Sequence, residues 1–235
     1  MTAPAPQLAS VTIDIWSDVM CPWCIIGYQQ LQNGLEQLAG EVEAEVRWHA
    51  FELNPDMPPE GEEQAGHIQR KYGRTAEQAA AGREQMRGIA ERAGYSFDYT
   101  GEGEAPAGMM WNTFAAHKLL LWTLATEGSV AQTRLKLALF DAHFQQRRNV
   151  SDPDVLVTIA AALGLDPAAA RAALSDQGLG EAVRREEQEA WDLNITGVPA
   201  MVINGRYMIP GAQEPEVYAN AVRRMIAAAG SVSHS

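Results

Sequence analysis

The chain has 235 residues, of which 46% are hydrophobic and 20% are charged. This balance is typical of a globular protein, and a chain of this length buries a core without disulfide or metal staples. The formal net charge of −12, with no basic run longer than two residues, argues against nucleic-acid binding. No uninterrupted apolar stretch reaches the roughly 18 residues of a membrane-spanning helix, so no membrane association is expected.

The N-terminal segment MTAPAPQLAS is small and rich in proline and alanine, and we interpret residues 1–10 as a flexible tail. It contains neither the basic region nor the apolar core of a secretory signal peptide. The sequence therefore predicts a cytoplasmic protein, and a chain that lacks its leader is the alternative.

A strand, a helix and a second strand follow the tail. Residues 11–16 (VTIDIW) alternate apolar β-branched residues with other side chains, which is typical of a strand. Residues 22–40 carry apolar residues at helical spacing, and residues 45–51 (EVRWHAF) alternate again. A strand, a helix and a strand within about 40 residues predict a βαβ unit with parallel strands.

The middle of the chain has a helical pattern. A loop rich in proline, glycine and acidic residues, at 54–63, leads into a stretch without a strand pattern that extends to about residue 194. Asp152-Pro153 and Asp166-Pro167 each place a capping residue before a first-turn proline. The expected helices are 64–72, 76–94, 109–126, 131–146, 154–163, 167–174 and 178–193.

Strand character returns near the C-terminus. Residues 200–204 and 206–209 flank Asn204-Gly205, which is a strong hairpin signal, and a last amphipathic helix is expected at 214–229. The element order therefore predicts an α/β domain, interrupted by an all-helical insertion. We assign residues 11–60 and 195–230 to the α/β domain, 61–194 to the insertion and 231–235 to a tail.

The two cysteines, Cys21 and Cys24, stand in the motif CPWC, directly after the first strand and at the start of the first helix. Unpaired N–H groups at a helix N-terminus favour an anion, and they lower a cysteine pKa from ~8.5 to roughly 3.5–7.5. Cys21 is therefore expected to be the nucleophile, and Cys24, one turn later, the thiol that resolves a mixed disulfide. Pro22 suits the first helical turn. Trp23 forms part of an exposed rim that influences redox poise, or packs over the helix start, and these two roles are compatible.

The cysteine pair does not fit a structural zinc site. Such a site needs four ligands, but there is no second cysteine pair and the histidines lack a ligand spacing, so no metal is expected. A pair of inert buried thiols is the remaining alternative to a redox role. No organic cofactor is expected, because thiol–disulfide exchange needs none.

The segment SDVMCPWC at 17–24 and the segment TGVP at 196–199, on either side of a helical insertion, resemble the DsbA family of thiol–disulfide oxidoreductases. Within that family the chain most resembles the FrnE-type branch, to which the segments NTFAAH at 112–117, SDP at 151–153 and GAQ at 211–213 are also similar. The resemblance extends from about Val11 to Ala228. It implies a thioredoxin-like fold of βαβ and ββα segments around the helical insertion.

The resemblance also implies roles for single residues. Pro199 matches the cis-proline that faces the cysteine pair in this fold, and Val198 would then expose its backbone to an extended substrate. The alternative is an ordinary proline at the start of a strand. Asp18 is a possible proton relay or a capping carboxylate, and His117 is a possible contributor near the site or a satisfied core histidine.

Three functions compete. The leading interpretation is an oxidoreductase or isomerase of protein or peptide disulfides, with a low-molecular-weight thiol or a cytosolic reductant as electron partner. Without a second cysteine pair, Cys21 and Cys24 must exchange directly with that partner. In the reducing glutathione poise of a cytosol, such a protein is expected to reduce or reshuffle disulfides rather than make them.

The second interpretation is a glutathione-dependent isomerase or a kappa-like glutathione transferase, since hydroxychromene-carboxylate isomerases and kappa-class transferases have a similar insertion. Those relatives typically carry serine at the position of Cys21, which argues against it. In that case Asn54, Val198 and Ala212-Gln213 would contact glutathione by position. The third interpretation is a holdase-like or partner-binding protein whose cysteines only sense oxidation.

Overall fold

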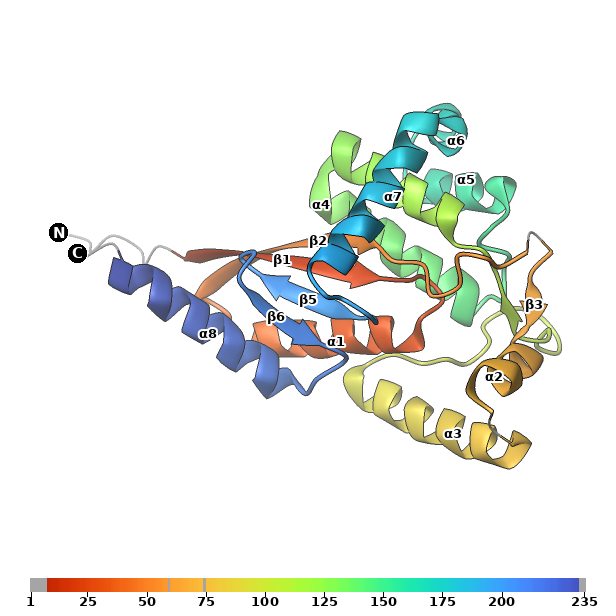
Figure 1. Ribbon diagram of the computed structural model, residues 1–235, viewed down its shortest axis with the longest axis horizontal. Coiled ribbons are helices and arrows are strands. Elements are labelled where there is room, and N and C mark those ends of the chain that lie inside the picture. Colours follow the sequence, from red (N-terminus) through yellow and green to blue (C-terminus); the bar gives the residue numbers. More distant parts are fainter. Residues whose placement is uncertain (1–7, 59, 74, 233–235) are drawn as a thin grey trace.

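The computed structural model describes residues 8–58, 60–73 and 75–232. A four-stranded sheet with the strand order β2-β1-β5-β6 forms the centre of the molecule (Figure 1). The parallel pair expected from the βαβ pattern is present, because β1 and β2 run parallel, whereas β5 and β6 are antiparallel to their neighbours. The strands span Ala9–Ser17 (β1), Val42–Ala50 (β2), Ala200–Ile203 (β5) and Tyr207–Pro210 (β6).

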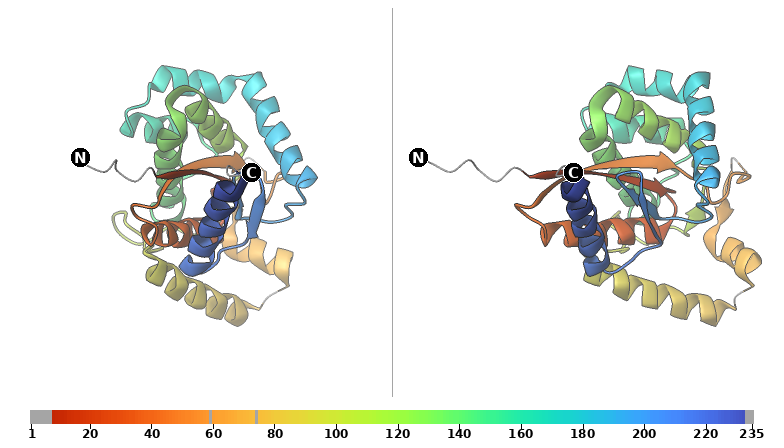
Figure 2. Two further views of the ribbon diagram at one scale, coloured as in Figure 1. Left: turned by 90° about the vertical axis from the view of Figure 1, so that its left-hand side faces the viewer. Right: turned by 60° about the vertical axis from the view of Figure 1, so that its left-hand side comes forward.

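Helices cover both faces of the sheet (Figures 1 and 2). On one face, α1 (Pro22–Glu36) and α8 (Pro215–Val232) lie side by side, with α3 (Ala76–Ala93) beyond them. On the other face, α4 (Phe114–Phe144) packs along β2. The predicted thioredoxin-like fold with many additional helices is thereby confirmed.

The remaining helices follow the sequence signals closely. Asp152 and Asp166 cap their helices as expected, each accepting a backbone N–H bond inside the first turn. Gly164, just past one helix end, has a positive φ of 87°. These helices are α2 (Gln64–Tyr72), α5 (Pro153–Ala162), α6 (Pro167–Ser175) and α7 (Gln177–Asp192).

The prediction of an uninterrupted helical stretch was wrong at one point. Two short strands, β3 (Glu62–Glu63) and β4 (Met109–Met110), pair antiparallel. The helix predicted at 109–126 therefore begins only at Phe114. Two residues are too few to show an alternating pattern, so only the tertiary contact between the segments reveals these strands.

The two helices predicted at 109–126 and 131–146 form the single element α4, which is interrupted at Gly128. Gly128 has φ 85° and ψ 178°, a conformation that is essentially restricted to glycine. The chain thus leaves the helical conformation at one residue and resumes it. Gln132, just beyond the break, bonds the backbone N–H and C=O of Trp48 and so satisfies part of the β2 edge.

The chain ends differ slightly from expectation. Strand β1 begins at Ala9, inside the predicted N-terminal tail, and α8 continues to Val232, inside the predicted C-terminal tail. Residues 1–7 and 233–235 of those tails lie outside the described residues. The predicted hairpin is present, with Asn204 and Gly205 both at positive φ, as a tight turn between β5 and β6 requires.

Candidate functional site

Three segments meet at one end of the sheet, where β1 and β2 finish and β5 begins. Ser17 and Ala50, the last residues of β1 and β2, are paired, so the segments that follow these parallel strands leave the sheet side by side. The segment that enters β5 arrives at the same end from the opposite direction (Figure 1). The Cys-x-x-Cys motif, the loop after β2 and Val198 are therefore neighbours, although they are distant in sequence.

The cysteine pair begins α1. Cys21 is the N-cap residue in an extended conformation, and Pro22 occupies the first helical position as predicted. The backbone N–H of Cys24 donates to the carbonyl of Cys21 at 3.0 Å, and the two cysteines, both reduced, approach within 3.2 Å. Cys21 is 3% exposed and Cys24 is fully buried, so Cys21 is the thiol nearer to solvent.

Val198 and Pro199 lie against the cysteine pair. The Val198–Pro199 peptide bond is cis, and the Cys21 thiol donates to the carbonyl oxygen of Val198 at 3.6 Å. A side chain at Gly27 of α1 would come within 3.0 Å of the Pro199 ring, so the glycine permits this close approach. The segment before β5 is thereby held directly beside the reacting sulfur.

Trp23 differs from its neighbours in the motif, because its side chain is 41% exposed. It forms part of the surface next to the buried thiols, and this is the arrangement expected for a rim residue. An apolar ring in this position can contact whatever approaches Cys21.

Asp18 is buried and joins two of the converging segments. Its carboxylate accepts hydrogen bonds from the backbone N–H groups of Met20, at 3.3 Å, and of Leu53, at 2.7 Å. Its backbone carbonyl accepts the N–H of Cys21 at 3.2 Å. Burial raises the pKa of Asp18 above its ordinary value, while the Leu53 bond and the charge of Lys136 act against that rise.

His117 lies close to Asp18 without bonding it. Its Nε2 is 3.9 Å from Asp18 Oδ1 and has no hydrogen-bond partner in the described part of the chain. Burial, and then the charges of Lys136 and Arg184, hold the pKa of His117 well below its ordinary value. The imidazole is therefore neutral, which fits a core histidine that borders the site rather than an acid ready to donate a proton.

The sequence reasoning missed Lys136, a fully buried lysine of α4. Its Nζ donates to the carbonyl of Ser17 at 3.3 Å and lies above the rings of Trp48 and Phe140. Burial lowers the pKa of Lys136 to about 8, although Cys24 and Asp18 favour its charged form. Its one sequence signal is a lysine within the apolar run LKLALF, which fits an ordinary helical pattern.

These groups change the expectation for the Cys21 thiol. A helix N-terminus alone predicts a lowered pKa. In the reduced structure, the hydrogen bond with Cys24 and burial raise the pKa of Cys21 well above its ordinary value, and the charge of Asp18 acts in the same direction. Lys136 acts the other way: it is a buried cation whose charged form Cys24, Asp18 and Cys21 all favour, so its charge in turn favours a thiolate.

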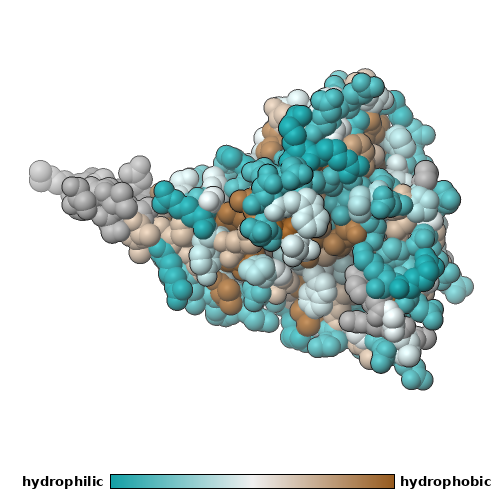
Figure 3. Space-filling view, viewed as in Figure 1, coloured by the Kyte–Doolittle hydropathy of each residue, from teal (hydrophilic) through white to brown (hydrophobic). Residues whose placement is uncertain are grey.

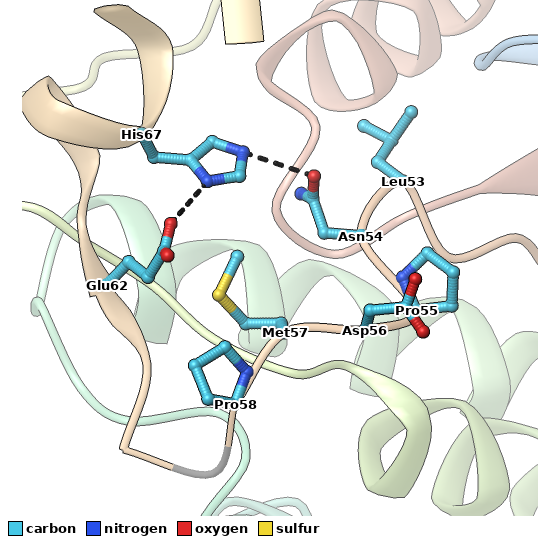
Figure 4. A pocket seen from close by; sticks show the side chains of 8 residues that line it. All are labelled: Leu53, Asn54, Pro55, Asp56, Met57, Pro58, Glu62 and His67. Atoms are coloured by element: carbon cyan, nitrogen blue, oxygen red, sulfur yellow. Dashed lines mark hydrogen bonds and ion pairs between the residues drawn. The ribbon is translucent and has the colours of Figure 1, made fainter. Parts of the chain in front are cut away.

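A pocket of about 260 Å³ lies between the loop after β2 and the start of α2 (Figure 4). His67 of α2 spans one side of it, with Nδ1 2.7 Å from Glu62 Oε2 and Nε2 3.1 Å from Asn54 Oδ1. Asn54, one of the positions considered for glutathione, therefore lines a cavity, whereas Ala212 lies against α1 near Gly27.

Neither a metal cluster nor a membrane span is found in the described part of the molecule. Among the residues that the structure describes, no three or more His, Cys, Asp or Glu side chains are grouped so that they could hold a metal ion. No helix in the described ranges is long and apolar enough to span a membrane.

Solved structures with a similar fold include the following three. A probable DsbA oxidoreductase from Streptomyces coelicolor is 30% identical, has a TM-score of 0.80 and covers 91% of this chain and 89% of its own. A 2-hydroxychromene-2-carboxylate isomerase is 16% identical, with a TM-score of 0.65 and coverage of 94% and 98%. The cytosolic disulfide reductase DsbM from Pseudomonas aeruginosa, solved with GSH, is 18% identical, with a TM-score of 0.58 and coverage of 92% and 98%.

The last two similarities concern the fold alone. The sequence itself matches the family described as DSBA-like thioredoxin domain over residues 12–223, nearly the whole chain. The expected kinship with the DsbA family is thus confirmed, while the FrnE-type branch stays a prediction. The chain therefore belongs to the DSBA-like thioredoxin domain family, whose general activity is thiol–disulfide exchange.

Proposed function

We propose that this protein is a cytoplasmic dithiol–disulfide oxidoreductase that reduces or reshuffles disulfides of proteins or peptides. The observation that carries the proposal is the position of Cys21. It caps α1, precedes a buried Cys24 by one turn and faces the Val198 carbonyl. An inert pair of thiols would need none of this geometry.

The reaction has two steps. The Cys21 thiolate attacks one sulfur of the substrate disulfide, forms a mixed disulfide and releases a substrate thiolate, which takes up a proton. Cys24 then loses its proton and attacks Cys21 Sγ, which forms the Cys21–Cys24 disulfide and releases the second substrate thiol. The dithiol is oxidised by two electrons and the substrate disulfide is reduced by two.

The surrounding residues have supporting roles in this proposal. Val198 offers its backbone to an extended substrate next to Cys21, with Pro199 holding that segment against α1. Asp18 receives the proton that Cys24 gives up, and Lys136 offsets the carboxylate charge. Trp23 provides apolar contact at the rim, and His117 helps to pack the buried side of the site.

A low-molecular-weight thiol is the proposed electron partner, because the chain holds no second cysteine pair to pass electrons on. The pocket lined by Asn54 and His67 is the candidate position for it. The similar fold of the cytosolic reductase DsbM, whose structure contains GSH, supports both the compartment and this kind of partner.

The reduction potential of the Cys21–Cys24 pair tests the proposal. We would measure it by tryptophan fluorescence in glutathione redox buffers, with Cys24→Ser as the variant that cannot form the intramolecular disulfide. A value near about −270 mV would fit a reductase, and one of about −120 to −200 mV an isomerase or oxidant. If no intramolecular disulfide forms at any poise, the dithiol mechanism is wrong.

Glutathione-dependent isomerisation or transfer is the second candidate. The pocket at Asn54 and the shared fold of the hydroxychromene-carboxylate isomerase favour it. Such chemistry activates glutathione at one position and does not need Cys24. A Cys24→Ser variant with undiminished turnover of a glutathione-dependent substrate would therefore support this candidate over the first.

A further inference from the structure

A second cavity, of about 220 Å³, lies on the α7 side of the loop after β2. None of the steps proposed above uses it. Aromatic, acidic and basic side chains line it together. They are Phe51, Glu52, Pro55, Arg184, Glu187 and Trp191.

The charges in this cavity do not balance. Arg184 Nη1 lies 2.5 Å from Glu52 Oε2 and 2.7 Å from Glu187 Oε2, so two carboxylates share a single guanidinium nitrogen. With both carboxylates ionised, one negative charge is left over. The guanidinium also stacks on an aromatic ring, with its central carbon 4.3 Å from the centre of the Phe114 ring.

One carboxylate oxygen is also left without a donor. The Glu52 side chain is only 1% exposed, and its Oε1 has no hydrogen-bond partner in the part of the chain that the structure describes. A buried acceptor without a donor is costly, and hydrogen bonds to charged groups are the stronger ones. The cavity is therefore short of one hydrogen-bond donor at Glu52 Oε1, a position that a cationic donor would fit best when the carboxylate is ionised.

An aromatic wall stands next to this unpaired charge. Trp191 is 57% exposed although it is among the largest apolar side chains, and its ring lies 6.2 Å from that of Phe51. The face of an exposed indole attracts an ammonium or guanidinium group. Figure 3 shows hydrophobic side chains gathered near the middle of this face, over β5, β6 and the end of α7, with polar side chains over α6 and most of α7.

The cavity borders the place where a substrate would lie. Phe51 belongs to the apolar cluster against which Val198 packs, and Val198 contacts Cys21. Farther along the same loop, Leu53 is bonded to Asp18 just before the dithiol. A polypeptide that extends along Val198 toward α7 thus reaches the cavity within a few residues of its disulfide.

We propose that this cavity binds the side chain of a lysine or arginine that lies close to the disulfide in a polypeptide substrate. Glu52 and Glu187 pair with the cationic head, and Trp191 covers the aliphatic stem. The inference rests on the proposed function, since it names the substrate class of that site. The net charge of −12 also favours basic polypeptide segments over acidic ones.

The charge state of the cavity supports the same partner. Burial, together with the charge of Glu187, raises the pKa of Glu52 to about 7, while Arg184 lowers it and Asp18 adds to the rise. The cavity is therefore most negative above neutral pH. Preference for a basic side chain should grow from pH ~6 to pH ~8 and shrink with added salt.

The test uses pairs of disulfide-bonded peptides that differ only by lysine or glutamine at one position, placed in turn at each position flanking the reactive cysteine. We expect the wild type to prefer lysine at one position by about tenfold in kcat/KM, the size of one charge-assisted contact. Glu187→Gln should abolish the preference. Glu189→Gln removes the same charge from an exposed position of the same helix and should retain it.

A separate binding measurement distinguishes failure of this inference from failure of the proposed function. Calorimetry with the same peptides, their cysteines alkylated, measures lysine preference without any disulfide exchange. If the protein binds the lysine peptides selectively but does not reduce their disulfides, the proposed function is wrong and the cavity assignment is kept. Turnover without lysine preference, or a preference that persists in Glu187→Gln, overturns the assignment. So does equally tight binding of free lysine amide, because the site would then select small cations.

Discussion

Two regions surround the cysteine pair, and they contribute different kinds of groups to the site. The strands and α1 bring sulfur and backbone, namely the thiols of Cys21 and Cys24 and the carbonyl of Val198. Helix α4 brings the buried charge of Lys136, and α7 brings the half-exposed Arg184 together with Glu187, which meet Glu52 of the loop after β2. The reacting atoms and Asp18 thus come from one short local segment, whereas the buried cation Lys136 comes from a helix of the insertion.

The difference has a consequence for evolution and for engineering of the site. A thiol at a helix N-terminus is reactive by position, but its pKa responds to every charge buried nearby. Helices that pack on the far side of the sheet can therefore retune the dithiol without touching its motif. Variants that remove a reacting atom should stop the chemistry, and variants of the helices should only shift it.

Removal of the Cys21 thiol should have the largest effect. Cys21→Ser is expected to slow reduction of a peptide disulfide by about 10³-fold or more, since the remaining thiol, Cys24, is fully buried. Cys24→Ser should instead accumulate the mixed disulfide on Cys21, which mass spectrometry detects. An unchanged melting temperature serves as the folding control. Residual turnover by Cys21→Ser near the wild-type rate would place the chemistry elsewhere.

The next largest effect is expected from variants that remove a buried charge near the cysteine pair. Lys136→Met removes the buried cation and should raise the pKa of Cys21 further, slowing exchange by roughly tenfold near neutral pH. Asp18→Asn removes the opposing anion and should lower the Cys21 pKa, at a cost in stability because an amide cannot accept both N–H bonds. The ultraviolet absorbance of the thiolate against pH reports both shifts. Shifts in the same direction would contradict this electrostatic account.

A smaller effect, on the free energy of unfolding, is expected where the sheet meets α7, a contact that we call the seam. His49 of β2 lies 2.9 Å from Asp14 of β1 and 2.9 Å from Glu186 of α7. Burial lowers the pKa of His49, but the two carboxylates outweigh burial and raise it to about 9. Because the folded pKa lies above the unfolded value, this stabilisation is complete below pH ~6.5 and is lost as pH rises through about 9.

His49→Gln should accordingly cost about 2 kcal/mol of unfolding free energy at pH 6 and much less at pH 10, measured by urea denaturation. The matched control is His67→Gln, whose histidine contacts Glu62 and Asn54 away from the seam. A cost for His49→Gln that does not change with pH would mean that its contribution is packing rather than charge.

The local parts of this protein could be predicted from its residues alone. The βαβ pattern, the Asn204-Gly205 hairpin and the caps at Asp152 and Asp166 all rest on residues that are close together in the chain. The position of the Cys-x-x-Cys motif at a helix start is equally local. Interactions over such short separations recur wherever the pattern occurs, so the pattern is enough to predict them.

The surroundings of the thiols, in contrast, depend on how distant segments pack. Packing brings Val198 to Cys21 across 177 positions, buries Lys136 against the end of β1 and leaves Glu52 short of a donor. It also reverses the expected shift of the Cys21 pKa. The physical reason is that a charge acts through distance and through the solvent that packing excludes, and neither is written in the spacing of residues along the chain.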